Sequence, residues 1–366
     1  MIVLLCALLS LAPPTSDYET ELAQIQQQTA AITGDPIEKA TKHAFLVYRR
    51  ASLTADYADF KAAETAIDGV IAEIGPSEDL YLLKANFDFK LHRLARAKED
   101  LEKTPDLADD AGVAALRADL ALQEGRYDEA KNGYETALRK KRTWDNLARL
   151  AYLKSKTGDV AGADKLYVEA EDEITAKEMR SYAWVELQRG LLHFDAGRYA
   201  KALEHYERAS RAYSGYWLIE EHIAEVLHAL GRKDESVALY RKLIERTHNP
   251  EYVSALAAIL GREDFYAEAD RLFQEQSALY PEAALGHHLK SMLARKSPSP
   301  DLLALAEKNV RLRPNGDAKL LLARAYLKLN EPAKARAEIA EILATPWRTP
   351  ELSKFSKQVR SRVSSL

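Results

Sequence analysis

The chain has 366 residues, of which 47% are hydrophobic and 30% charged, with only 15 glycines and 13 prolines. This composition can supply an extended core and excludes a disordered chain. A net charge of −4, from 52 basic and 56 acidic side chains, gives no general attraction to phosphate backbones, so we expect no nucleic acid partner. The single cysteine, Cys6, excludes disulfides and cysteine-ligated metal sites from the rest of the chain.

The first segment, residues 1–16, contains an apolar run from Ile2 to Ala12 that only Ser10 interrupts. Its length fits the hydrophobic region of an export signal and is too short to span a bilayer as a helix. We therefore expect a signal peptide, a periplasmic or extracellular protein, and no integral membrane segment in the mature chain. No lysine or arginine precedes the run, and the alternative is a misassigned start or a disordered N-terminus on a cytoplasmic protein.

Two helical stretches come next, at residues 17–33 and 36–50. We expect them to form an N-terminal helical cap over residues 17–43. The end of a stacked array exposes an apolar face, and a cap shields that face from water.

Between residues 44 and 347 one pattern returns eight times: a small residue, an alanine or serine anchor 12 positions later, and a bulky residue four further on. The anchors are Ala63, Ala97, Ala130, Ala163, Ala202, Ser236, Ala269 and Ala335. Successive anchors are 34, 33, 33, 39, 34, 33 and 66 residues apart, and a period in this range predicts stacked helix-turn-helix units. The fold class is therefore all-α, a solenoid of about eight or nine units.

The pattern has a mechanical reason. Residues 12 apart across a tight turn face each other on two antiparallel helices, and small side chains let the backbones approach closely. A glycine stands five residues before four of the anchors, at Gly125, Gly158, Gly197 and Gly231, where a helix end needs a left-handed backbone. Asn330 holds the same place in the last unit, while His92 and Asp264 fit it less well.

Two steps depart from the period. The 39-residue step predicts a longer second helix that ends near Thr175, with Thr175 and Glu178 forming a capping box for the next helix. The 66-residue step equals two periods, so we expect a degenerate unit near residues 284–314 with its turn at 297–300.

The last segment, residues 348–366, places Leu352, Phe355, Val359 and Val363 on one helical stripe. We expect a C-terminal capping helix. A helix on a membrane surface is the alternative, but it normally has a larger and more aromatic apolar face.

The repeats resemble the tetratricopeptide repeat family, whose 34-residue pattern has a small residue at position 8, alanine at 20 and an aromatic residue at 24. The match is close over residues 184–190 and 197–202, and again at Tyr206 and Ala209. The resemblance implies a right-handed α-α superhelix whose first helices line a concave groove for a protein partner.

In this family the groove is lined by the residues 18, 15, 11 and 8 positions before each anchor. Transferred to this chain, the resemblance gives as groove residues Asn86, Phe89, Asp119, Leu122, Tyr152, Trp184, Leu187, Leu191, Phe194, Glu221, Glu225 and His228. The lining changes from apolar and aromatic to acidic along the axis. Part of the apolar lining can instead be covered by the superhelix itself.

The sequence contains no Gly-rich phosphate loop, nucleophile elbow or zinc-protease motif, so we assign no catalytic residue, cofactor or metal. One cluster allows an alternative. Glu221, Glu225 and His228 are spaced i, i+4 and i+7 on one helix face, and two carboxylates with an imidazole can ligate a divalent metal.

The sequence thus predicts a non-enzymatic scaffold or adaptor that holds a peptide or helix of another protein in its groove. Trp184, Leu191 and Phe194 are the expected apolar anchors, while Glu221 and Glu225 are expected to select a basic group on the partner. The alternative is a metal- or small-ligand-binding accessory protein that uses the face of Glu221, Glu225 and His228.

Overall fold

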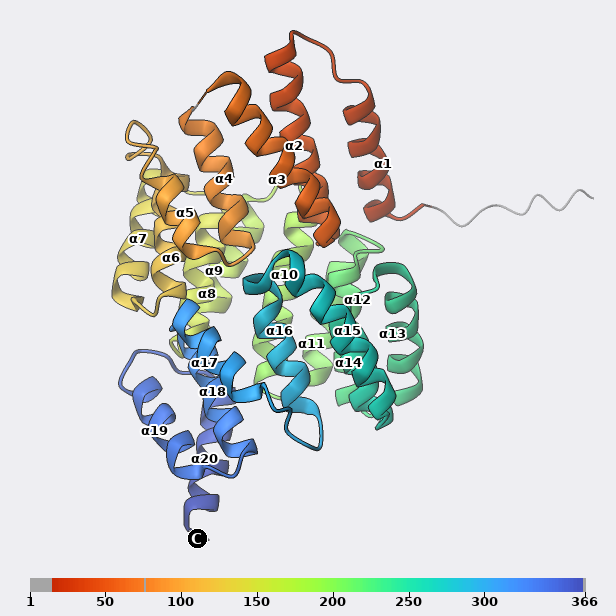
Figure 1. Ribbon diagram of the computed structural model, residues 1–366, viewed down its shortest axis with the longest axis vertical. Helices are drawn as coiled ribbons and strands as arrows, with labels where there is room; N and C mark the ends of the chain where they lie inside the picture. The colour runs from red at the N-terminus through yellow and green to blue at the C-terminus, as the bar shows by residue number, and fades with distance from the viewer. Residues whose placement is uncertain (1–14, 76, 365–366) are drawn as a thin grey trace, which may run out of the picture.

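The structure is a computed structural model that describes residues 15–75 and 77–364. These residues form 20 helices and no strand, which confirms the all-α superhelix of helix-turn-helix repeats (Figure 1). Most of the expected signal peptide at 1–16 lies outside the described residues, and export stays a prediction. Within the described part, no helix combines the length and the apolar character needed to cross a membrane.

Eighteen of the helices form nine antiparallel pairs, each joined by a short turn. The first helices of the pairs are α2 (Pro36–Thr54), α4 (Glu78–Lys90), α6 (Ala111–Gln123), α8 (Trp144–Lys156), α10 (Met179–Asp195), α12 (Trp217–Ala229), α14 (Pro250–Leu260), α16 (Pro281–Ala294) and α18 (Gly316–Lys328). The second helices are α3 (Tyr57–Ile74), α5 (Leu94–Leu101), α7 (Tyr127–Lys140), α9 (Val160–Glu173), α11 (Tyr199–Ala212), α13 (Lys233–Thr247), α15 (Glu263–Leu279), α17 (Leu302–Leu312) and α19 (Pro332–Leu343). The two remaining helices, α1 (Asp17–Ala30) and α20 (Pro350–Ser364), flank the array.

The anchors of the repeat pattern lie where the two helices of a pair meet. All eight have 0% exposure. Gly190 shows why the facing residue must be small, because a Cβ atom there would lie 2.3 Å from the ring of Tyr206. Ser236 is the one anchor that is not alanine, and its hydroxyl donates a 2.7 Å hydrogen bond to the carbonyl oxygen of Ala224. The prediction that small residues 12 positions apart let the two helices of a pair pack closely is confirmed.

The turns inside the pairs have the expected left-handed backbone. The φ angles of Gly125, Gly158, Gly197 and Gly231 lie between 73° and 90°, and those of Asn330 and His92 are 62° and 58°. In the unit of Asp264 a different residue, Gly261, takes this conformation with φ of 67°.

The 39-residue step has a different cause from the one expected. The second helix, α9, has 14 residues, as many as α7 and α11. The extra residues lie in the connection at 174–178 and in α10, which has 17 residues. Thr175 does donate from its hydroxyl to Glu178, at 2.8 Å, but this contact stabilises the connection and α10 begins only after it.

Both ends of the array differ in detail from the expected boundaries. The boundary of the N-terminal cap at residue 43 falls inside α2, which pairs with α3 as the first repeat, so α1 alone precedes the pairs. Helices α16 and α17 occupy the stretch where a degenerate unit was expected. At the other end α20 packs on α19 and buries Leu352, Phe355 and Val359.

Successive turns of the superhelix touch each other. The amide of Tyr18 donates to the carbonyl of Ser214 at 3.1 Å, which joins the start of α1 to the segment before α12. The hydroxyl of Tyr280 donates to Glu64 at 3.0 Å, across 216 residues of sequence. Farther along, the amide of Gly316 donates to the hydroxyl of Tyr127 at 2.8 Å, across 189 residues. The inner wall is therefore partly covered by the chain itself, and α16 to α18 lie beside the earlier repeats (Figure 1).

Candidate functional site

A cavity of about 620 Å³ lies on the inner wall of the superhelix, where α4, α6, α8 and α10 run side by side. Ser52 of α2, Tyr134 of α7 (Tyr127–Lys140) and Tyr216, which precedes α12, complete it. Its aromatic lining residues are Phe89, Tyr134, Trp144, Tyr152, Trp184 and Tyr216. The cavity thus draws its wall from first helices of successive repeats and from the coiling that brings distant segments together.

Two tryptophans form the centre of this aromatic wall. The rings of Trp144 and Trp184 lie 6.2 Å apart with an angle of 60° between their planes. Both side chains are half-buried, because one edge packs on the core between α8 and α10 while the other faces the cavity. Large aromatic surfaces that are held rigidly and partly exposed are typical anchors for a bound segment.

The cation of Arg149 is already neutralised inside the cavity. Its guanidinium donates to Asp119 at 3.0 Å and to Asp145 at 2.7 Å. The hydroxyl of Tyr134 also donates to Asp119, at 2.7 Å. Burial raises the pKa of Asp119, against the lowering effect of Arg149. These four groups satisfy one another and shape the floor of the cavity.

Lys90 differs from Arg149 because its charge has no partner. Its ammonium group makes no hydrogen bond or ion pair with any described residue. Burial lowers the pKa of Lys90, and the positive charge of Arg180 lowers it further. Arg180 itself lies 3.5 Å from a carboxylate oxygen of Glu21. One edge of the cavity therefore carries an uncompensated positive charge that an anionic group can neutralise.

Five of the groove residues expected from the sequence line this cavity, namely Phe89, Asp119, Leu122, Tyr152 and Trp184. Asn86 lies apart, in a depression of about 570 Å³ between α2 and α4, where its amide nitrogen donates to the carbonyl of Leu82.

Three expected apolar groove residues do not line the cavity. Leu187 is only 1% exposed and packs in the core with Ala202 and Tyr206, so its assignment to the groove is wrong. Leu191 and Phe194 lie farther along α10, and the ring of Phe194 packs 5.3 Å from that of Tyr199.

Most of the other lining residues were not among the groove residues expected from the sequence, and four of these matter most for binding: Lys90, Trp144, Arg180 and Tyr216. Trp144 and Arg180 lie in the first turns of α8 and α10, and Lys90 ends α4, so all three lie on first helices but outside the positions that the family pattern uses. Tyr216 lies in a connection and carries no periodic signal.

The acidic groove residues form a second and separate cluster. Nδ1 of His222 lies 3.3 Å from a carboxylate oxygen of Glu221 and 3.3 Å from one of Glu225. His228, which the sequence grouped with these carboxylates, is exposed in the last turn of α12 and does not join them. Burial raises the pKa of Glu221 to about 7. Burial disfavours the charged form of His222, but the two carboxylates outweigh it and raise the pKa of that imidazole.

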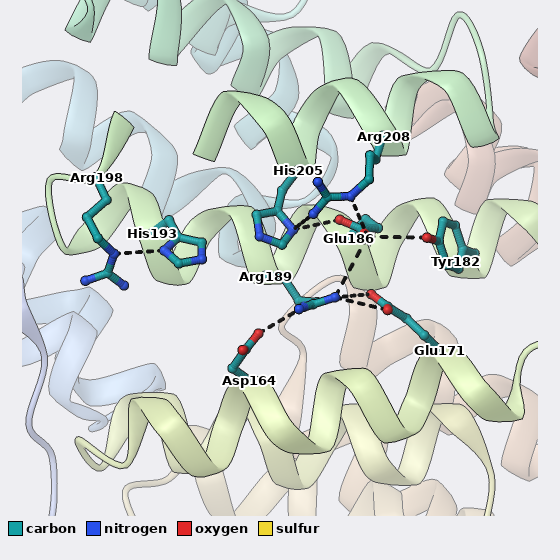
Figure 2. A network of polar contacts seen from close by, with 9 residues as sticks. All are labelled: Asp164, Glu171, Tyr182, Glu186, Arg189, His193, Arg198, His205 and Arg208. Carbon is teal, nitrogen blue, oxygen red and sulfur yellow. Dashed lines mark hydrogen bonds and ion pairs between the residues drawn. The ribbon is translucent and has the colours of Figure 1, made fainter. Parts of the chain in front are cut away.

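A third polar cluster joins α9, α10 and α11 (Figure 2). The carboxylate of Glu186 accepts from His205 at 2.7 Å and from Arg208 at 3.0 Å. Arg189 joins α10 to α9, with hydrogen bonds of 2.9 Å to Asp164 and about 3.0 Å to Glu171. Burial alone raises the pKa of Glu186, but its hydrogen bonds hold that pKa at about 2. Glu186 and His205 are buried and the arginines pair with carboxylates of neighbouring helices, so the network stabilises the stacking of two repeats.

Comparison with known proteins supports the prediction that the repeats are tetratricopeptide repeats. Sequence models described as tetratricopeptide repeat match residues 187–250 and 316–341. No curated protein matches the sequence.

Solved structures give low overall similarity. Yeast Tom70 is 13% identical, with 94% of this chain and 96% of that chain covered and a TM-score of 0.37. A tetratricopeptide repeat protein from Parabacteroides merdae is 14% identical, with 68% and 98% covered and a TM-score of 0.40. Pseudomonas aeruginosa pilF is 18% identical, with 58% and 95% covered and a TM-score of 0.41.

The identification of the repeats therefore depends on the two sequence matches and on the packing of the helix pairs. The first match spans α11, α12 and α13. This stretch has the paired small residues, the glycines in the turns and the aromatic residue four positions after the anchor. The second lies on α18 and α19, which repeat the same packing. Residues 187–250 and 316–341 are therefore identified as tetratricopeptide repeats, and the other helix pairs have the same helix-turn-helix arrangement.

Proposed function

We propose that this protein is a non-enzymatic scaffold that holds a peptide segment of a partner protein in the cavity between α4 and α10. Tetratricopeptide repeats commonly serve protein–protein interaction, and the inner wall is their usual binding surface. The observation that supports the proposal most is the combination of the Trp144 and Trp184 wall with the unpaired ammonium group of Lys90.

The chemistry of the cavity favours a particular kind of segment. A volume of about 620 Å³ accommodates a few side chains rather than a whole folded helix. An aromatic or large aliphatic side chain fits against the tryptophans, and a carboxylate fits beside Lys90, since its ammonium group has no other partner and can form a charge-assisted hydrogen bond with it. We therefore propose a partner segment that combines an apolar anchor with an acidic group.

This proposal changes two details of the sequence-based hypothesis. Leu191 and Phe194 have no role as anchors in this proposal, because they do not line the cavity. Glu221 and Glu225 do not select the charge of the segment, since they lie on α12 outside the cavity lining. The charge expected on the partner is negative rather than positive.

The test is to select peptides from a random library on the full chain and to measure their binding by fluorescence anisotropy. Trp184→Ala should weaken binding by more than about tenfold, as expected for an aromatic anchor. Lys90→Glu should abolish the preference for acidic residues. Phe194→Ala is the matched control, an aromatic residue of the same helix outside the cavity, and should bind as the wild type does. The proposal fails if no peptides are enriched, or if the two aromatic variants bind equally.

The alternative function, a metal- or small-ligand-binding accessory protein, was expected to use Glu221, Glu225 and His228. The exposed position of His228 removes that particular ligand set. The cluster around His222 raises a different and independent possibility.

A further inference from the structure

One turn of α12 brings three metal-binding side chains together at the acidic cluster. Glu221, His222 and Glu225 each offer one donor atom, and the three atoms lie within 4.8 Å of one another. The carboxylates and the imidazole are half-buried, so the cluster is reachable by an ion yet shielded from bulk water. None of these residues lines the aromatic cavity.

The spacing of the donors fits a small divalent ion. Nδ1 of His222 lies 3.3 Å from an oxygen of each carboxylate. Zinc bonds to nitrogen and oxygen ligands are about 2.0–2.1 Å long, and tetrahedral angles then place neighbouring donors about 3.3–3.4 Å apart. The distances from His222 to both glutamates therefore already match those expected around a bound zinc ion.

The charge of the cluster is only partly balanced by the protein, through His222 and through the positive charge of Lys290, which acts on Glu221 without forming an ion pair with it. Among the described residues, the only ion-pair partner of Glu221 and Glu225 is His222, and neither carboxylate pairs with a lysine or arginine. Two carboxylates that approach one imidazole this closely leave at least one negative charge without a full partner. A bound cation supplies that partner.

A buried hydroxyl gives an independent indication of a missing ligand. The side chain of Tyr206 is 0% exposed, and its hydroxyl has no hydrogen-bond partner among the residues that the structure describes. Its ring stacks on His222 with centroids 5.6 Å apart, and the charges that act most strongly on its hydroxyl are those of Glu225 and Glu221. Buried hydroxyl groups are nearly always hydrogen-bonded, so this one indicates an absent group such as a metal-bound water.

We propose that Glu221, His222 and Glu225 bind one zinc-type divalent ion, with the fourth coordination position held by a water that pairs with the hydroxyl of Tyr206. One nitrogen and two carboxylate donors suit zinc and its neighbours in the first transition row. Magnesium and calcium prefer six or more oxygen ligands, which this cluster does not offer.

The test is a titration of the metal-free full chain with zinc chloride alone, followed by isothermal calorimetry. We expect one zinc ion per chain. His222→Ala should weaken zinc binding by more than about tenfold, since it removes one of the protein's ligands. His228→Ala is the matched control, a histidine of the same helix outside the cluster, and should bind zinc as the wild type does.

A second measurement covers the case in which His222→Ala does not fold. Glu225→Gln keeps the shape of the side chain, and cobalt bound to the wild-type chain should give the intense visible absorption of a tetrahedral site, which this variant should lose. The proposal is overturned if the wild type binds no zinc, if it binds magnesium or calcium in preference, or if the His222 and His228 variants bind zinc equally. Trp184→Ala should leave zinc binding unchanged, so failure of the peptide proposal is distinguishable from failure of this one.

Discussion

Replacing Gly190 by alanine tests the packing principle of the whole array. Gly190 lies in the middle of α10 and faces α11. A Cβ atom added there would lie 2.3 and 2.6 Å from two ring carbons of Tyr206 and 3.2 Å from the Cβ atom of His205. The tyrosine ring is 0% exposed, so it has no free space into which to move.

The expected free-energy change is the difference between two opposing effects. Alanine favours a helix over glycine by about 1 kcal/mol. Overpacking of a closed core costs about 1–3 kcal/mol, and contacts this short with a fully buried ring place the cost near the upper end. Gly190→Ala should therefore lower the free energy of unfolding by about 2 kcal/mol.

Gly69→Ala is the matched control, because Gly69 is also helical but has no atom within 4 Å of an added Cβ. There the helix preference acts alone, and the free energy of unfolding should rise by about 0.5–1 kcal/mol. Urea denaturation followed by circular dichroism measures both variants, and the two changes should have opposite signs. If Gly190→Ala stabilises the protein as Gly69→Ala does, the close approach of the paired helices is not what holds the repeats together.

Three further changes probe single contacts. Glu186→Gln should lower the free energy of unfolding by about 3 kcal/mol near neutral pH. The reason is that the pKa of Glu186 in the folded protein, about 2, lies below the value of about 4.3 for an unperturbed glutamate. This stabilisation is complete above about pH 4.3 and is lost as the pH falls toward 2, so denaturation curves of variant and wild type should converge there. Tyr127→Phe leaves the buried amide of Gly316 without its acceptor and should cost about 1–3 kcal/mol, with faster hydrogen exchange at that amide. Ser236→Ala should change the unfolding free energy by less than about 1 kcal/mol, because the carbonyl of Ala224 lies inside a helix and alanine is the residue at the other anchors.

The fold was predictable because its determinants are local. The small pairs and the turn residues repeat within each unit, so residues 12 positions apart identify each helix pair. The cause of the 39-residue step was not predictable, because five extra residues can lengthen a helix or a connection equally well. The contact between Tyr280 and Glu64 was not predictable from the repeat period either, because it depends on the accumulated twist of several units.

The candidate site was predictable only in part for the same reason. The groove positions implied by the family resemblance include Tyr152 and Trp184, and both line the cavity. They do not indicate that Tyr216 closes the cavity from a connection. Helix periodicity favoured His228 over His222 as the partner of the two glutamates, because residues seven apart share a face on an ideal helix. His228 lies in the exposed last turn, however, whereas His222 is held against Tyr206.

The contacts between successive turns affect how the chain unfolds. In an open array each unit touches only its neighbours, so the end units fray first. Here Trp217 donates to the carbonyl of Leu53, and Gly316 donates to Tyr127, so the two ends are each fastened to the middle. Loss of either end also removes support from central repeats. The molecule should therefore unfold with greater cooperativity than a linear stack of equal length, and fold more slowly, because contacts distant in sequence must form before the structure gains their stability.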